Sequence, residues 1–191
     1  MTTEVTPPAH APHDTLLLCV DMQPVFVRAI FDGEKVQRRC AFAATVAARL
    51  SLPIILTEQV PGKLGATATP LTEAAPSASV YSKRTFSAFA DERIRDAIIK
   101  ESSVEHILLC GIETPICVYQ TAIAALGHGL EVTVLSDCVG ARRSDDAQTC
   151  LEALARAGAH ILPSETVFYA VLGDVGHPFF KEYTQLVKAF A

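Results

Sequence analysis

The sequence predicts an α/β fold, in which helices cover both faces of a parallel β-sheet. Two observations carry this prediction. Continuous apolar runs, as in strands buried on both faces, recur along the chain. Between them lie longer segments with the periodicity of amphipathic helices, so the pattern indicates βαβ units. With no internal repeat and no linker, we expect one domain over residues 15–191, preceded by a loose arm over residues 1–14.

The first half of the chain shows the pattern clearly. Residues 15–20 form an apolar run that stops at Asp21, and residues 53–57 form a second one, so both are predicted strands. The Ala-rich segment 27–50 between them is a predicted helix. Residues 58–77 hold prolines and glycines with no period, which indicates a long functional loop without structure of its own.

The second half continues the alternation, and Asp91 is the expected N-cap of its first helix. The predicted strands are 78–82, 106–111, 130–136 and 159–162. The predicted helices are 91–101, 114–127, 145–157 and 179–190.

Composition limits the classes of partner and the compartment. The net charge is -5 and no basic cluster exceeds two residues, so we expect no nucleic-acid partner. No apolar stretch approaches the roughly 20 residues that cross a bilayer, and the first 14 residues lack a signal-peptide pattern. We therefore expect a soluble, cytoplasmic protein without a membrane partner, whose six cysteines are reduced thiols.

Cys117 is the cysteine that stands apart. Cys19 and Cys110 lie inside apolar strands and are expected to be small buried hydrophobes. Thr114 as N-cap and Pro115 at the first helical position would place Cys117 in the first turn of a helix, where backbone N–H groups and the helix dipole lower a thiol pKa. The alternative is a packed thiol in an apolar helix, and the local sequence favours the two interpretations about equally.

Two charged residues follow other predicted strands, and ligands bind at the carboxyl ends of such strands. Asp21 is the carboxylate available as a general base, because none of the six histidines follows a strand in a way that would pair with the cysteine. The alternative for Asp21 is a turn cap before Pro24. Lys83 could orient Asp21, although Arg84 competes locally and a surface lysine is the plain alternative.

Three motifs together resemble the isochorismatase-like cysteine hydrolase superfamily. They are Asp21-Met-Gln, Lys83 with Thr85-Phe86, and Gly111-Ile-x-Thr-x-x-Cys117-Val118, and the match spans residues 15–167. The resemblance implies a three-layer α/β/α, Rossmann-like fold with a six-stranded parallel sheet and a catalytic triad of Asp21, Lys83 and Cys117. It also implies a cis peptide between Ile112 and Glu113, and an oxyanion hole formed by the backbone N–H groups of Glu113 and Cys117.

The stretch Thr57-Glu-Gln-x-Pro-x-x-Leu-Gly65 resembles the isochorismatase-domain-containing subgroup, some members of which carry a ribonuclease label. The charge balance argues against RNA here. The nicotinamidase branch places Asp and His metal ligands after the second strand, whereas this chain offers Glu58, Gln59 and Lys63. We therefore expect no metal, no cofactor and no nicotinamidase activity, and the presence of Cys117 also disfavours isochorismatase chemistry.

The expected function is hydrolysis of a small amide or related carbonyl-derived substrate through a thioester on Cys117. Candidate substrate-binding residues flank the motifs: Gln23, Phe26, Gln59, Phe86 and Phe89. For each of them a core or surface role is an open alternative. The rival function is a catalytically silent, oligomeric binding module. An apolar stripe on the last helix, at Leu186, Val187 and Phe190, favours a homo-oligomer (dimer or tetramer) under either hypothesis.

Overall fold

The computed structural model describes residues 14–99 and 103–191, so the arm predicted over residues 1–14 lies almost entirely outside the described residues. Six parallel strands form one sheet in the order β3-β2-β1-β4-β5-β6. They are β1 (Thr15–Val20), β2 (Ile54–Gln59), β3 (Ser79–Lys83), β4 (His106–Ile112), β5 (Glu131–Gly140) and β6 (His160–Leu162). The α/β fold and its six-stranded parallel sheet are therefore confirmed.

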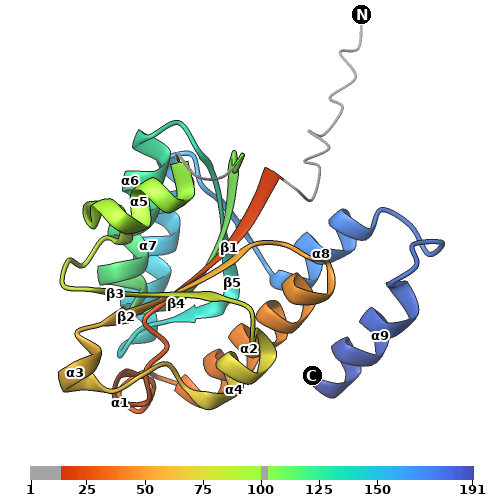
Figure 1. Cartoon of the computed structure of the whole chain (residues 1–191), viewed down its shortest axis with the longest axis horizontal. Helices are drawn as coiled ribbons and strands as arrows, with labels where there is room; N and C mark the ends of the chain where they lie inside the picture. Colours follow the sequence, from red (N-terminus) through yellow and green to blue (C-terminus); the bar gives the residue numbers. More distant parts are fainter. Residues whose placement is uncertain (1–13, 100–102) are drawn as a thin grey trace, which may run out of the picture.

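Helices cover both faces of this sheet (Figure 1). The group α5 (Glu92–Ile99), α6 (Tyr119–Gly127) and α7 (Ser144–Arg156) lies on one side. The group α2 (Gly33–Arg49), α4 (Thr69–Ala74), α8 (Ser164–Leu172) and α9 (Phe180–Ala189) lies on the other. Shorter turns complete the chain: α1 (Pro24–Val27), α3 (Pro61–Leu64), η2 (Ala88–Ala90) and η3 (Thr114–Val118).

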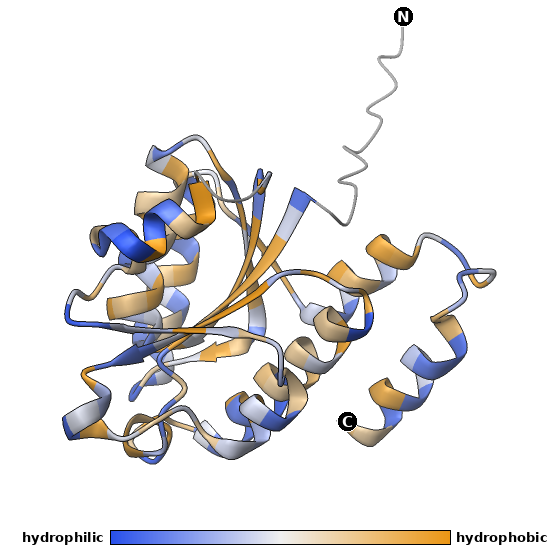
Figure 2. Ribbon diagram, viewed as in Figure 1, coloured by the Kyte–Doolittle hydropathy of each residue, from blue (hydrophilic) through white to orange (hydrophobic). Residues whose placement is uncertain are grey.

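The alternation of side chains along β1 divides the core into two halves. Leu17 and Cys19 belong to the cluster that contains the apolar residues of α2. Leu16, Leu18 and Val20 belong to the cluster on the opposite face, with the apolar residues of α6. All six residues of β1 are buried, and Figure 2 shows the hydrophobic colouring of the central strands. A strand apolar on both faces therefore fits only in the middle of the sheet.

Three buried thiols meet on the α2 side of the sheet. Cys19 and Cys110 are paired in register on β1 and β4, and Cys40 of α2 packs onto them, so that the three sulfur atoms lie within 4.8 Å of one another. Cys138 of β5 lies beside them and donates its S–H to the Arg39 carbonyl. The expected role of Cys19 and Cys110 as small buried hydrophobes is confirmed, since both are at most 2% exposed.

Two predicted elements are wrong in detail. The helix expected over 27–50 begins only at Gly33, as α2, and the short helix α1 precedes it. The chain turns so tightly between them that a Cβ at Gly33 would lie 2.0 Å from the Val27 carbonyl oxygen. The loop expected over 58–77 contains two short helices, α3 and α4, each with a proline in its first turn. Proline breaks a helix interior but suits a helix start, so it marked helix beginnings here.

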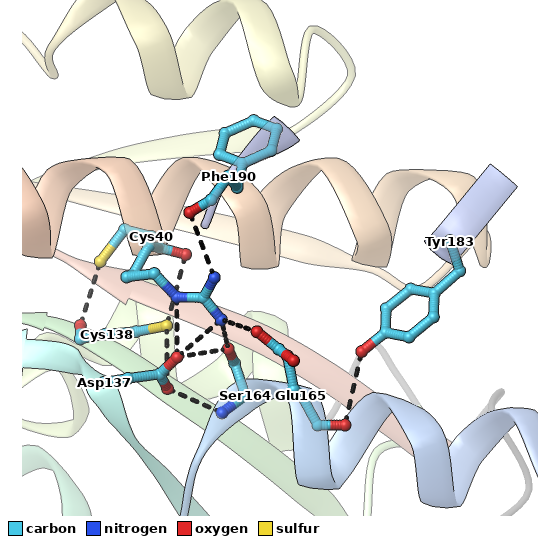
Figure 3. A network of polar contacts seen from close by, with 8 residues as sticks. Cys40, Asp137, Cys138, Ser164, Glu165, Tyr183 and Phe190 are labelled. Atoms are coloured by element: carbon cyan, nitrogen blue, oxygen red, sulfur yellow. Dashed lines mark hydrogen bonds and ion pairs between the residues drawn. The ribbon is translucent and has the colours of Figure 1, made fainter. Parts of the chain in front are cut away.

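The helix α8 was not predicted, and a buried polar network fixes its position (Figure 3). Arg39 of α2 donates from Nε to Asp137 Oδ2 (2.8 Å) and from Nη2 to Ser164 Oγ (2.8 Å) and Glu165 Oε1 (3.2 Å). Its Nη1 also donates to the Phe190 carbonyl at 3.5 Å. One guanidinium therefore joins α2, β5, α8 and the end of α9.

Candidate active site

The carboxyl ends of four strands bring the predicted site residues together. Asp21 follows β1, Gln59 and Lys83 end β2 and β3, and Cys117 lies in the turn η3 after β4. Strands β1 and β4 are neighbours at the point where the strand order reverses. This is where open α/β sheets bind ligands, because the loops on either side of it diverge.

Asp21 and Lys83 form a buried ion pair. Lys83 Nζ lies 2.6 Å from Asp21 Oδ2, and the two side chains are 0% and 1% exposed. The ammonium also donates to Gln59 Oε1 (2.7 Å) and to the Thr85 carbonyl (3.1 Å), so each of its three hydrogens has an acceptor. The other carboxylate oxygen, Asp21 Oδ1, accepts from Thr57 Oγ1 at 2.8 Å. Asp21 is therefore held in one orientation from both sides.

The Cys117 thiol faces this carboxylate. Burial, the negative charge of Asp21 and a hydrogen bond to its carboxylate together raise the pKa of Cys117 to about 12, against the opposing charge of Lys83. The expectation of a lowered pKa is therefore wrong, because desolvation outweighs the favourable helix terminus. The resting side chain is a neutral thiol beside the Asp21 carboxyl group, which Lys83 holds in place.

The turn that carries Cys117 also differs from the predicted helix start. Glu113 is the N-cap residue and no side chain caps the turn. Thr114 is already inside it, and its buried hydroxyl makes no hydrogen bond within the described part of the chain. The Val118 N–H donates to the Glu113 carbonyl at 3.2 Å, five residues back, so the turn is wider than an α-helical one.

The backbone before this turn requires a glycine. Gly111 has a φ of +112°, and a Cβ at this position would lie 2.1 Å from the Val20 carbonyl oxygen. Only glycine allows β4 to approach the end of β1 this closely. The peptide bond between Ile112 and Glu113, shortly after Gly111, is cis, at the position that the family resemblance implied.

A small cavity of about 90 Å³ opens onto the thiol and the carboxylate. Its walls are Asp21, Phe26, Gln59, Phe86, Ile112, Glu113, Ile116 and Cys117. Three of the candidate substrate-binding residues thus line the cavity: Phe26, Gln59 and Phe86. Ile116 and the support from Thr57 were missed, although Thr57 is in register with Val20 and could have been inferred from the sheet order.

Gln23 and Phe89 do not line this cavity, which corrects their expected role. Gln23 is fully buried and its side-chain amide bonds only to backbone, donating to the carbonyls of Gln59 and Gly65 and accepting from the Gln59 N–H. It holds the end of β2 and the following loop in place. Phe89 is buried and stacks on His128, with ring centroids 5.6 Å apart.

Glu58, which follows Thr57 at the site of the nicotinamidase metal ligands, is also accounted for. Glu58 Oε1 accepts from the Thr67 N–H (2.7 Å) and from Thr67 Oγ1 (2.9 Å), so it tethers the loop. Among the described residues, the group of three side chains that could share a metal ion is Cys19, Cys40 and Cys110, in the core and away from the cavity lining.

A fold of this class with a cavity at its switch point is typical of enzymes that bind small ligands. Residues 15–166 match the family model described as the isochorismatase domain. The chain therefore belongs to the isochorismatase family, which includes hydrolases. Within the described residues, no helix is both long and apolar enough to span a membrane.

Individual relatives agree over nearly the whole chain. The chain is 35% identical over 177 residues to the isochorismatase domain-containing protein 2 of Bos taurus, covering 93% of this chain and 84% of that protein. It is 32% identical over 180 residues to the secreted isochorismatase effector Isc1 of Phytophthora sojae, with 93% and 86% covered. The solved structure of the MAR1 ribonuclease from Caenorhabditis elegans superposes with a TM-score of 0.86 at 31% identity, covering 93% and 91% of the two chains.

Proposed function

We propose that this protein is a cysteine hydrolase that cleaves a small amide or related carbonyl-derived substrate through a thioester intermediate, without a metal ion. The observation that carries the proposal is the placement of the Cys117 thiol against the Asp21 carboxylate, at the wall of one cavity. A nucleophile beside an oriented base is the arrangement that covalent catalysis needs.

The geometry suggests a role for each member of the triad. Asp21 takes the S–H proton as the sulfur attacks the substrate carbonyl, so the thiolate forms only during the attack. Lys83 does not line the cavity and acts as a positioning residue that holds Asp21 in place. In the proposal, the backbone N–H groups of Glu113 and Cys117 stabilise the oxyanion.

The remaining steps close the cycle. Collapse of the tetrahedral intermediate breaks the carbon–nitrogen bond, and Asp21 returns its proton to the leaving amine. A water molecule, deprotonated by Asp21, then attacks the thioester. The acid leaves and the proton returns to the Cys117 sulfur, so the net reaction consumes one water and forms one acid and one amine.

The ribonuclease name of the structural neighbour belongs to that protein. Here the net charge of -5 and a cavity of about 90 Å³ favour a much smaller and less charged ligand than RNA. Ligand pockets for drug-sized molecules measure roughly 300–1,000 Å³. Glu58, bound to Thr67, likewise gives no support to a nicotinamidase metal site.

We also propose that the protein is a cytoplasmic homo-oligomer, a dimer or a tetramer, although the apolar stripe of the last helix no longer supports this. The apolar stripe of α9 packs against the α2 side of the core, so Leu186, Val187 and Phe190 are already partly buried within the chain. The exposed apolar side chains that would suit a second copy are instead Phe31 and Val175, at 60% and 78% exposure. Sedimentation of the wild type and of a Phe31→Ser variant tests this assembly.

The test of the enzymatic proposal is a screen of small amides for amine release, with the wild type, Cys117→Ala and Cys150→Ala. Cys150 is a partly exposed thiol on α7 and serves as the matched control. We expect turnover and a mass increase of the acyl group for the wild type and Cys150→Ala only. Activity that survives Cys117→Ala would refute the mechanism, and an unmodified, inactive wild type would favour the silent binding module.

A further inference from the structure

The cavity beside Cys117 is narrow and its walls are mostly apolar. Phe26, Phe86, Ile112 and Ile116 surround the reacting groups. Its volume of about 90 Å³ is well below the roughly 300–1,000 Å³ of pockets that hold drug-sized ligands. Phe86 is 56% exposed although it lines the cavity, so it lies where the cavity meets solvent. An acyl group beyond a few atoms would have to displace this ring.

The ionisable side chains that line the cavity, apart from the Cys117 thiol, are all acidic. Two lining residues, Asp21 and Glu113, are carboxylates, and the lining contains no lysine, arginine or histidine. The ammonium of Lys83 is fully buried and its three hydrogens are bound. A negatively charged substituent would lose its water and meet two carboxylates without a free cation, and both effects oppose binding.

Arg142 only partly offsets this field. Its Nε donates to Glu113 Oε2 at 3.0 Å, and its side chain is 55% exposed while that of Glu113 is 16% exposed. An exposed guanidinium is screened by water and salt, whereas the shielded carboxylate acts on the cavity at close range. The pair therefore leaves a net negative potential at the cavity.

From these contacts we infer the substrate class, on the basis of the proposed function: the acyl part is a short, uncharged aliphatic group. Phe86 limits its length, and the Glu113–Arg142 pair sets the discrimination against anions. The leaving group lies toward solvent and is less restricted. These side chains determine specificity, and the triad determines reactivity.

The experiment uses p-nitrophenyl esters, whose cleavage releases a coloured product in the acylation step. One series varies chain length through acetyl, butyryl and hexanoyl esters. A shape-matched pair varies charge alone: the 3-methylbutanoyl ester and the malonyl half-ester, in which a carboxylate replaces the terminal isopropyl group. We expect the hexanoyl ester to acylate Cys117 at least about tenfold more slowly than the acetyl ester, and the malonyl ester at least about tenfold more slowly than its neutral partner.

Variants separate the two determinants. Phe86→Ala should raise the rate with the hexanoyl ester relative to acetyl and leave the charge ratio unchanged. Glu113→Gln, which keeps the backbone N–H, should lower the ratio of the acylation rate with the neutral ester to that with the anionic ester. Arg142→Gln should raise this ratio. Val80→Ala, which shortens an exposed side chain outside this cavity, should change neither ratio.

The outcomes distinguish this inference from the function on which it depends. If no ester acylates Cys117, as judged by intact mass with Cys117→Ala as reference, the proposed function fails. If acylation depends on Cys117 but the hexanoyl ester reacts as fast as the acetyl ester, or the malonyl ester as fast as its neutral partner, the substrate class is overturned and the hydrolase stands.

Discussion

Lys83 Nζ lies 2.6 Å from Asp21 Oδ2, and neither side chain is open to solvent. Each of these charges depends on the other, because burying an ion without a partner is costly. The pair spans β3 and the end of β1, which lie on either side of β2, and Gln59 of β2 completes it. The same contacts therefore serve the stability of the sheet edge and the orientation of the base.

We predict that Lys83→Met lowers the free energy of unfolding by about 3–5 kcal/mol, because it leaves the Asp21 carboxylate buried without a counterion. The double variant Lys83→Met/Asp21→Asn should regain a substantial part of this loss, since no charge then remains. Urea denaturation of the wild type, both single variants and the double variant measures the coupling. Additive single effects would show that the pair does not act as a unit.

We predict that the reactivity of Cys117 and its catalytic turnover respond in opposite directions to Asp21→Asn. The pKa of the thiol is about 12, so alkylation by iodoacetamide should be slow at pH 7 and rise steadily up to pH 10. Removing the Asp21 charge and acceptor lowers this pKa, which speeds alkylation at pH 8 by about threefold for each unit by which the pKa falls. Turnover should fall because the base is lost. Peptide mass spectrometry of Cys117 labelling checks the rate, and slower labelling in the variant would contradict it.

We predict that Gly111→Ala costs more than about 3 kcal/mol of stability or prevents folding, because the new Cβ would overlap the Val20 carbonyl. Gly158→Ala is the matched control: its φ of +105° is similar, but no atom lies within 4 Å of the Cβ. It should cost about 1–2 kcal/mol, the strain of the left-handed conformation alone. Equal losses in thermal denaturation would show that backbone conformation, and not the close approach, requires glycine at 111.

We predict a loss of stability in acid that depends on Asp137. Burial acts to raise the pKa of this carboxyl, but hydrogen bonds from Ser164 and the charge of Arg39 outweigh it and lower the pKa below 3.8. The stabilisation is therefore complete above about pH 4 and is lost as the pH falls through the lowered pKa. The unfolding free energy of the wild type should fall more steeply between pH 4 and pH 2 than that of Asp137→Asn, with Ser164→Ala intermediate. Parallel curves for all three proteins would refute this.

Much of the sheet could be predicted because its central strands are apolar on both faces. Thr15–Val20 was located to the residue, and the switch-point rule then placed Asp21 and Cys117 at one edge. The helices α3, α4 and α8 could not be predicted in this way, because they are short or held by tertiary contacts such as Arg39 to Ser164. Local periodicity carries no information about such contacts.

The site was harder to predict where its chemistry depends on burial. Helix position alone suggested an activated thiol, whereas the Cys117 pKa is set by desolvation and by Asp21, which are properties of the assembled cavity. Gln23 is a similar case. Its place in the first motif suggested substrate contact, but its side-chain amide forms hydrogen bonds with the backbone at the end of β2.

Labelling of the thiols packed between α2 and the sheet measures how often this part of the core opens. Cys19, Cys40, Cys110 and Cys138 are each at most 2% exposed, so a reagent reaches them only when α2 lifts from the strands. The rate at which these four thiols become labelled in native buffer therefore reports how often this half of the core opens, residue by residue and without denaturant.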